Sequence, residues 1–441
     1  MKSKFLSVFL AVVFLMPKIS RAATYYVDCN AANDNGAGTS EGTAWKTFAK
    51  VNTTLTGDQS DTKVLFKKNC AWKEQLTVPG AGTSGHPFTF GAYGEGAKPV
   101  IDGSNHTNCI HGNGKNWINA DNFTLINANE AGLDTNGGDY WSVTNTTAHD
   151  NATYGLRISN GSDTCLFQDC IAYHNNLNGV VGNAYAGMGG YNANNLTIRR
   201  CESYAQGGFD GDGIQASSVR GVIIEYCTIH DNPRVSPGTS SDNIQLSNCT
   251  GATVRYNHLY GGCNSNIIFT GTNSYGEVYY NAISDGYNGI VNLASAPAGA
   301  INIYNNTVYN TTAYGLRIYY TGTNNITARN NIFHSTGSPL YIMSGINPTQ
   351  IFLSNNRYWY TGSSTNIFGW LSDKNSTFAT YVAASGKDTI GSSYSDPLNP
   401  DTFTTTGGTA SVYKTMADVN KKKLLPEIQF FSGKARPGGK P

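Results

Sequence analysis

The sequence has little charge and few of the patterns that build helices. Charged residues make up 13% of its 441 residues, and the formal net charge is +1. Because proteins that bind nucleic acids carry a basic surface, we expect no nucleic-acid partner. Few stretches have the 3.6-residue apolar period of amphipathic helices, which disfavours a helical fold. The sequence has no Cys-x-x-Cys pair and no phosphate-binding loop, so we expect neither a zinc site nor an organic cofactor.

Long apolar runs are also missing, with one exception at the N-terminus. Lys2 and Lys4 precede the apolar run 5–16, and small residues around Ala22 follow it. This pattern predicts a signal peptide over residues 1–22, cleaved after Ala22, and a secreted, extracellular or periplasmic protein. The run is too short to span a bilayer, and no other stretch is apolar enough. We therefore expect no membrane association after cleavage.

What the sequence does contain is a motif that returns along the chain. Residues 154–158 and 314–318 both read Tyr-Gly-Leu-Arg-Ile. Degenerate copies begin between them, with successive first residues 23 to 34 positions apart, at Asn178, Asp212, Asp242, Ser265 and Asn288. A period of this length is typical of a solenoid in which each repeat forms one coil.

A second motif runs in step with the first and consists of a short alternating strand followed by a polar residue. Aligning these segments stacks one residue per coil, namely Cys170, Cys201, Cys227, Asn257, Asn281, Asn306, Asn331 and Asn356. Asparagine suits a tight turn because it tolerates left-handed backbone angles and bonds nearby backbone groups. The sequence therefore predicts an asparagine and cysteine ladder.

The sequence has nine cysteines, so at least one is unpaired. Plausible disulfides join Cys29 to Cys70 and Cys249 to Cys263. We expect the cysteines of the ladder to be small buried packing residues.

Three segments carry a resemblance to a known family. Residues 24–28 (Thr-Tyr-Tyr-Val-Asp), 42–47 and 88–103 resemble the entry segment and first coils of secreted pectate-lyase-like proteins. The resemblance implies an all-β fold, a single right-handed parallel β-helix of about ten coils. That family includes polysaccharide lyases, glycosidases, epimerases, tailspikes and adhesins, so the fold alone does not identify a reaction.

The repeat and the resemblance together suggest five segments. We expect the signal peptide, an N-terminal cap with the first coils over 23–105, and the β-helix over 106–362. A closing segment over 363–413 and a basic, poorly ordered tail over 414–441 follow. We expect a monomer.

The functional site is expected where extra residues interrupt the repeat, because such insertions form loops on one face of a solenoid. Three interruptions fall in consecutive coils, at 181–191, 206–211 and 231–238. They surround the two copies of the motif that begin with an aspartate. The interruptions therefore place the candidate site at these two coils.

The alignment stacks Asp212 against Asp242, with their backbones about 4.8 Å apart. Like charges this close require either a bridging cation or a carboxyl with a raised pKa. Asp210 adds a third carboxyl group, and oxygen ligands of this kind suit calcium. We therefore predict Asp210, Asp212 and Asp242 as calcium ligands and the latter two as catalytic residues. The alternative is that these aspartates simply cap strands.

Other candidates are assigned around this pair. His230 and Arg234 are predicted catalytic residues, as bases that take a proton from the substrate. The lysine-based lyases of the family do not fit, because no lysine occurs between Lys115 and Lys374. The predicted substrate-binding residues are Arg157, Asn178, Tyr185, Tyr191, Gln215, Gln245 and Tyr260.

Three functions fit these residues. The first is a secreted lyase that cleaves a uronate-containing polysaccharide by β-elimination with calcium. The second is an inverting glycoside hydrolase of the polygalacturonase-like type, although the Gly-Asp-Asp, Gly-His-Gly and Arg-Ile-Lys patterns of that group are absent. The third is a non-catalytic, glycan-binding or adhesive solenoid. An epimerase shares its first step with the lyase.

Overall fold

The structure is a computed structural model that describes residues 22–389, except 177–184, 209, 234–239, 295–298, 320–321, 323–324, 364–366, 372 and 376. The predicted signal peptide up to residue 21, residues 390–413 of the predicted closing segment and the predicted tail lie outside the described residues. Within them, no helix is long and apolar enough to cross a membrane.

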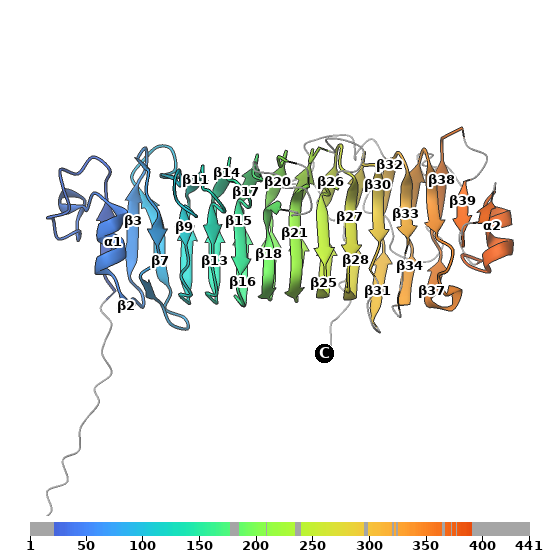
Figure 1. The fold of residues 1–441 in the computed structure, drawn as a ribbon, viewed down its shortest axis with the longest axis horizontal. Helices are drawn as coiled ribbons and strands as arrows, with labels where there is room; N and C mark the ends of the chain where they lie inside the picture. Colours follow the sequence, from blue (N-terminus) through green and yellow to red (C-terminus); the bar gives the residue numbers. More distant parts are fainter. Residues whose placement is uncertain are drawn as a thin grey trace, which may run out of the picture.

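The described chain forms an elongated parallel β-helix, as the sequence predicts (Figure 1). Each strand of the helix pairs in parallel with the strand one coil later, and three series of such pairings run along the rod. We call the three series face A, face B and face C. Two of them belong to a 26-stranded sheet, and face C is a separate sheet of 12 strands.

Face A consists of β5 (Leu76–Thr77), β9 (Ile110–His111), β12 (Leu133–Asp134), β15 (Leu156–Ser159), β18 (Tyr185–Asn194), β21 (Gly211–Arg220), β24 (Ile244–Ser247), β27 (Ser265–Thr270), β30 (Asn288–Asn292), β33 (Tyr314–Ile318), β36 (Ser338–Ile342) and β39 (Phe368–Trp370). Face B consists of β1 (Thr24–Val27), β3 (Lys63–Lys67), β7 (Phe88–Tyr93), β10 (Ile118–Asp121), β13 (Trp141–Thr144), β16 (Cys165–Gln168), β19 (Leu196–Arg199), β22 (Ile223–Glu225), β25 (Thr250–Arg255), β28 (Ser274–Tyr279), β31 (Ala300–Tyr304), β34 (Asn325–Arg329) and β37 (Ile351–Ser354).

Face C consists of β4 (Ala71–Trp72), β8 (Val100–Asp102), β11 (Thr124–Ile126), β14 (Thr147–His149), β17 (Ile171–Tyr173), β20 (Glu202–Tyr204), β23 (Thr228–His230), β26 (His258–Tyr260), β29 (Ala282–Ser284), β32 (Thr307–Thr311), β35 (Ile332–Ser335) and β38 (Arg357–Tyr360). The remaining elements are β2 (Gly57–Asp58) paired with β6 (Gly80–Ala81), β40 (Asp373–Asn375) antiparallel to β39, the helices α1 (Phe48–Thr54) and α2 (Phe378–Ser385), and two 3₁₀ turns at Glu41–Thr43 and Pro348–Gln350.

Alternation of apolar and polar residues explains why these short segments form strands. In β15, Leu156 and Ile158 are buried in the core, and Arg157 between them lies on the outer surface. The corner from face B to face C is tight, because one residue there adopts left-handed angles in each coil, for example Tyr256 at φ 57° and Asn305 at φ 58°. Asparagine reaches these angles with little strain.

Directly after this left-handed residue comes the predicted ladder. The backbone N–H and side-chain amide of Asn281 both donate to Oδ1 of Asn306. The same two groups of Asn306 donate to Oδ1 of Asn331. The cysteines of the column, Cys170, Cys201 and Cys227, are unpaired and buried. The ladder and the packing role of these cysteines are confirmed.

A second ladder, which the sequence analysis missed, runs inside the corner from face C to face A. Side-chain oxygens accept hydrogen bonds along the series Asn151, Asn175, Gln206, Asn232, Asn243 and Asn266. Each bond joins successive coils except the one from Asn232 to Asn243, which lies within one coil. All three interruptions of the repeat open at this same corner, between a face C strand and the following face A strand. A set of satisfied polar side chains thus supports the backbone from inside where the loops leave it.

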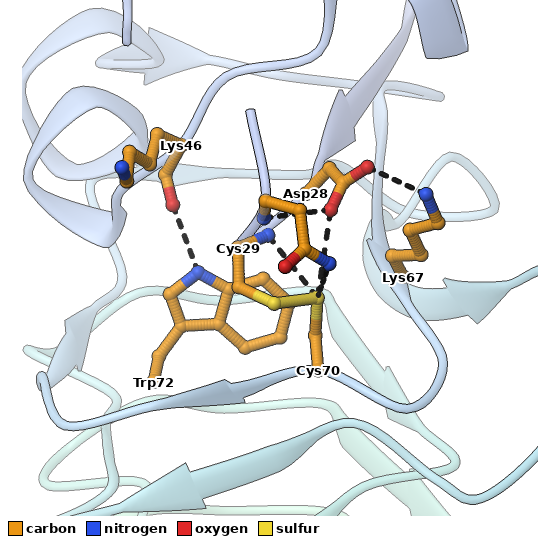
Figure 2. Close-up of a disulfide and its surroundings, with 7 residues drawn as sticks. Asp28, Cys29, Lys46, Lys67, Cys70 and Trp72 are labelled. Carbon is orange, nitrogen blue, oxygen red and sulfur yellow. Dashed lines mark hydrogen bonds and ion pairs between the residues drawn. A yellow bond between two sulfur atoms is a disulfide. The ribbon is translucent and has the colours of Figure 1, made fainter. Parts of the chain in front are cut away.

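The N-terminal end of the rod is closed by α1 and by a disulfide (Figure 1). The predicted Cys29–Cys70 disulfide is confirmed, and Figure 2 shows it between Asp28 and the Trp72 ring. The predicted Cys249–Cys263 disulfide is wrong, because both residues are unpaired and buried.

The other end is covered by α2. There the first ladder finishes on Asp388, whose carboxyl group accepts from the N–H and the side chain of Asn356. The hydroxyls of Tyr358 and Tyr381 donate to the same carboxyl group.

Candidate functional site

The candidate site lies on the outer side of the corner from face C to face A. Strand register places one residue per coil in a single outer column, namely Tyr154, Ala186, Asp212, Asp242, Ser265, Asn288 and Tyr314. The predicted stacking of Asp212 against Asp242 is confirmed.

The predicted copy of the motif at Asn178 is wrong. Leu156 pairs with Met188, so the motif of this coil begins at Ala186, and Asn178 itself lies outside the described residues. Residues 185–191 of the predicted loop belong to β18. The extra residues of this coil therefore precede the strand.

Asp212 and Asp242 are both fully buried, with no exposed surface. The backbone N–H of Asp242 donates to Oδ1 of Asp212 at 2.8 Å, and the side chain of Asn264 donates to Oδ1 of Asp242 at 3.2 Å. Among the described residues, the Oδ2 atoms of both aspartates have no hydrogen-bond partner. Each carboxyl group is thus held by one oxygen, and its second oxygen is unsatisfied.

This burial changes the acidity of the pair. Loss of water and the neighbouring charge of Asp242 raise the pKa of Asp212 well above its usual range. Burial also raises the pKa of Asp242 to about 7, although hydrogen bonds from Asn264, Ser265 and Gln245 oppose the rise. The two groups cannot both be ionised near neutrality unless a cation lies against them.

Asp210 is separate from this pair. It is 9% exposed, and its Oδ1 accepts from the N–H and the hydroxyl of Ser240 at 3.0 and 2.9 Å. In the described part of the chain, the one group of three His, Cys, Asp or Glu ligand atoms lying within 4.8 Å of one another is Asp28 with the disulfide-bonded Cys29 and Cys70. The three aspartates predicted as calcium ligands do not form such a group.

The outer surface beside the pair is polar and aromatic. Gln215 donates from Nε2 to Oε1 of Gln245 at 2.9 Å, and the hydroxyl of Tyr154 donates to Oε1 of Gln215. The Tyr185 ring contacts the Tyr154 ring edge-on at 5.8 Å, and Tyr191 is 50% exposed. The structure thus gathers Tyr185, Gln215 and Gln245 with Tyr154, which the sequence analysis had treated only as a repeat marker.

Arg157 is not free to bind an anionic substrate. Its guanidinium group lies 2.6 Å from the carboxylate of Asp134 and 3.0 Å from that of Glu130. It also lies over the Tyr154 ring at 5.6 Å from the ring centre. These contacts offset its positive charge and hold it against Tyr154.

His230 is also committed to other partners. Its ring is stacked between Tyr204 and Tyr260, with ring centres 5.0 and 4.7 Å apart. Its Nδ1 atom lies 2.9 Å from Asp231, and Nε2 lies 3.2 Å from Glu202. Burial disfavours its charge, but these carboxylates outweigh that effect and raise its pKa. A raised pKa disfavours the neutral form that a general base needs, and Tyr260 presents its ring face to His230.

The predicted base Arg234 lies outside the described residues. The residues that sequence reasoning missed are Tyr154, Asn264 and the second ladder. A signal for the ladder was present, because Asn151, Gln206 and Asn232 each lie two residues after an aromatic residue that ends a face C strand, namely His149, Tyr204 and His230.

The comparisons with known proteins agree with this architecture. Residues 131–296 match the family model described as a right handed beta helix region. No curated protein matches the sequence.

Several solved structures, including the following three, are similar to the chain. The first is a GH136 lacto-N-biosidase from Eubacterium ramulus, with a TM-score of 0.56 and 14% sequence identity, covering 80% of this chain and 68% of that chain. The second is XylC in complex with xylose, with a TM-score of 0.53 and 11% identity, covering 77% of this chain and 84% of that chain. The third is a mannuronic acid specific polysaccharide family 6 lyase from human gut microbiota, with a TM-score of 0.51 and 12% identity, covering 77% of this chain and 87% of that chain. At these identities the likeness shows a shared fold.

Proposed function

We propose that the chain, whose residues 131–296 match the right handed beta helix region, is a carbohydrate-active enzyme that cleaves a polysaccharide beside Asp212 and Asp242. Similar structures include a lacto-N-biosidase and a mannuronic acid specific lyase, which supports this class of activity. The site supports it independently, because buried acidic side chains with raised pKa values cluster at functional sites.

The reaction that the geometry favours is β-elimination on a uronate-containing polysaccharide with calcium. The observation that carries it is the pair of buried Oδ2 atoms of Asp212 and Asp242, for which the described part of the chain provides no hydrogen-bond partner. Unsatisfied carboxylate oxygens are the ligands that calcium prefers, so the residues present fit this ion. Asp212 and Asp242 would hold calcium, with Asp210 outside their immediate group.

Calcium bound there supplies positive charge that neutralises the uronate carboxylate and makes its neighbouring proton more acidic. The chain itself contributes orientation: Asn264 and the N–H of Asp242 each fix one oxygen of the pair. Tyr185 would protonate the leaving oxygen, a role supported by its partial exposure, its contact with Tyr154 and its pairing with Gly211 beside Asp212. We assign the proton-abstracting role to no described residue.

A second candidate function is hydrolysis by an acid and base pair. It is favoured by the pKa of Asp242 at about 7, because a carboxyl group that keeps its proton near neutrality can donate it to a glycosidic oxygen. Asp210, which lies outside the immediate pair, would then be the base.

One assay distinguishes these functions. The purified protein is incubated with uronate polymers and with neutral polysaccharides, with and without a calcium chelator. Elimination produces an unsaturated, ultraviolet-absorbing product whose formation stops with the chelator, whereas hydrolysis produces reducing ends without absorbance. A lack of cleavage on every polymer would favour a glycan-binding solenoid and contradict the proposal.

Two substitutions test the site. We expect Asp212→Asn and Asp242→Asn each to reduce kcat/KM by about 100-fold or more, because each removes a group that acts on the substrate or its cation. Asp169→Asn is the matched control, because Asp169 pairs with Arg200 on the outer surface at another corner. Full activity of Asp242→Asn would refute the assignment.

A further inference from the structure

The two exact copies of the Tyr-Gly-Leu-Arg-Ile motif have different surroundings. In both, the arginine lies over the tyrosine ring, at 5.6 Å for Arg157 and Tyr154 and 4.9 Å for Arg317 and Tyr314. Tyr314 packs against the ring of Tyr341, 5.0 Å away. Tyr154 instead extends along the rod toward the candidate site.

Tyr154 reaches the site by crossing an entire coil. Its hydroxyl donates to Gln215, which lies two coils further along face A. The intervening outer position is Gly189, between Arg157 and Gln215 in register. A Cβ atom at Gly189 would lie 1.9 Å from the carbonyl oxygen of Gln215 and 3.3 Å from Cε1 of Tyr154. The absence of a side chain at this position is therefore what lets the Tyr154 ring pass.

The hydrogen bond continues from Gln215 to the acidic pair. Gln215 donates to Oε1 of Gln245. The side chain of Gln245 in turn lies close enough to the Asp242 carboxyl group to stabilise its ionised form and oppose the rise in its pKa. Tyr154 and Gln215 are only 3% and 5% exposed, so water competes little for these groups. The series Tyr154, Gln215, Gln245 and Asp242 thus forms one relay.

The relay has a direction that chemistry dictates. When Asp242 is ionised, its carboxylate can only accept hydrogen bonds, so Gln245 must then turn its NH₂ group toward Asp242. The side-chain oxygen of Gln245 then faces Gln215, so the NH₂ group of Gln215 must donate to it. The side-chain oxygen of Gln215 in turn faces the hydroxyl group of Tyr154. The Tyr154 hydroxyl group completes this order by donating to Gln215.

We propose that Tyr154 is a positioning residue, which acts through Gln215 and Gln245 to keep an amide donor directed at Asp242 and so fixes the orientation of that carboxyl group. This inference rests on the proposed function of Asp242. The Tyr154 ring is itself held by Arg157, which is anchored by Asp134 and Glu130. The relay therefore links the ion pairs of earlier coils to the acidic pair.

The test compares Tyr154→Phe with Tyr314→Phe, because both remove one hydroxyl group from the same motif. Loss of a buried hydrogen bond that orients a reacting group corresponds to roughly a 3- to 10-fold effect. We expect Tyr154→Phe to lower kcat by roughly this factor with KM nearly unchanged, and Tyr314→Phe to change neither. Gln215→Leu should have a similar effect, and its combination with Tyr154→Phe should cause little further loss.

A second readout does not depend on activity. In thermal melts, the shifts caused by Tyr154→Phe and Asp242→Asn should be non-additive, because an asparagine no longer demands the donor. Tyr314→Phe and Asp242→Asn should be additive. Additive shifts in the first pair, or an unchanged kcat in Tyr154→Phe while Asp242→Asn is inactive, would overturn the relay. Full activity of Asp242→Asn would overturn the proposed function instead, and the melts would still decide the relay.

Discussion

Replacing Asn306 by alanine should destabilise the β-helix strongly, because this side chain makes five hydrogen bonds in the first ladder. Its amide group donates to the carbonyls of Val278 and Tyr304 and to Oδ1 of Asn331, at 2.9 to 3.1 Å. Its Oδ1 accepts from the N–H and the amide group of Asn281, at 3.1 and 2.9 Å. Asn306 is 1% exposed, so water cannot replace these bonds.

The size of the effect follows from these contacts. A net hydrogen bond contributes about 1 kcal/mol, and a buried group left without a partner costs about 1 to 3 kcal/mol. Because several of the five bonds share one donor or acceptor, we expect Asn306→Ala to lower the free energy of unfolding by about 3 to 5 kcal/mol. Equilibrium urea unfolding, followed by circular dichroism, measures this difference.

The chain itself supplies the matched control. Cys227 occupies the same column, and its thiol donates to the carbonyls of Ile198 and Glu225 at 3.6 and 3.3 Å. A cysteine sulfur can also accept, as Cys201 does from the N–H of Cys170. Asn306→Cys should therefore cost roughly half as much as Asn306→Ala. A cost below about 1 kcal/mol for alanine, or equal costs for both variants, would refute this account of the ladder.

Two other predictions concern the ends of the rod and the acidic pair. The Cys29–Cys70 disulfide closes a loop with a sequence separation of 41, so replacing both cysteines by serine should lower the free energy of unfolding by about 4 kcal/mol. Urea unfolding measures this loss, and adding reductant to the parent protein should reproduce it. The pKa of Asp242 rises on folding from 3.8 to about 7, so the folded state binds the proton more tightly and stability should fall as pH rises through this window, by up to about 4 kcal/mol. Melting temperatures measured in the presence of a chelator between pH 4 and 8 should show this fall, and Asp242→Asn should flatten it. An equal slope of melting temperature against pH in the variant would contradict the assignment.

Most of the fold could be predicted from local sequence rules. The step Asn305-Asn306 shows why, because the first residue supplies the left-handed angle of the corner and the second supplies the buried ladder side chain. Both requirements favour asparagine, so asparagine recurs at the same positions of successive coils and can be recognised in the sequence. The stacking of Asp212 against Asp242 could be predicted for the same reason.

The register of one coil could not be predicted in this way. Residues 186–188 take the place that the motif assigned to Asn178. Here the inward position is Gly187, because any Cβ atom would lie 2.2 Å from the Ser203 hydroxyl and 2.6 Å from the Gln206 amide. That constraint comes from the following coil, which a repeat consensus does not contain.

The role of His230 was also beyond local reasoning. Its neutral-range titration made it a natural choice of base, but Glu202, 28 residues earlier, provides one of the two carboxylates that hold it. Partners that meet through stacking of coils have no fixed sequence signature.

The first ladder also determines how this protein can change in length. From Asn281 to Asn331 every coil receives the same two hydrogen bonds from the coil before it and gives the same two to the coil after it. Asp388 ends the series, because its carboxyl group accepts both hydrogen bonds from Asn356 and passes none on. A whole coil can therefore be inserted or deleted in this stretch without creating an unmatched donor, and Asp212 and Asp242 keep their neighbours. Overall length and the active-site coils are thus free to evolve independently.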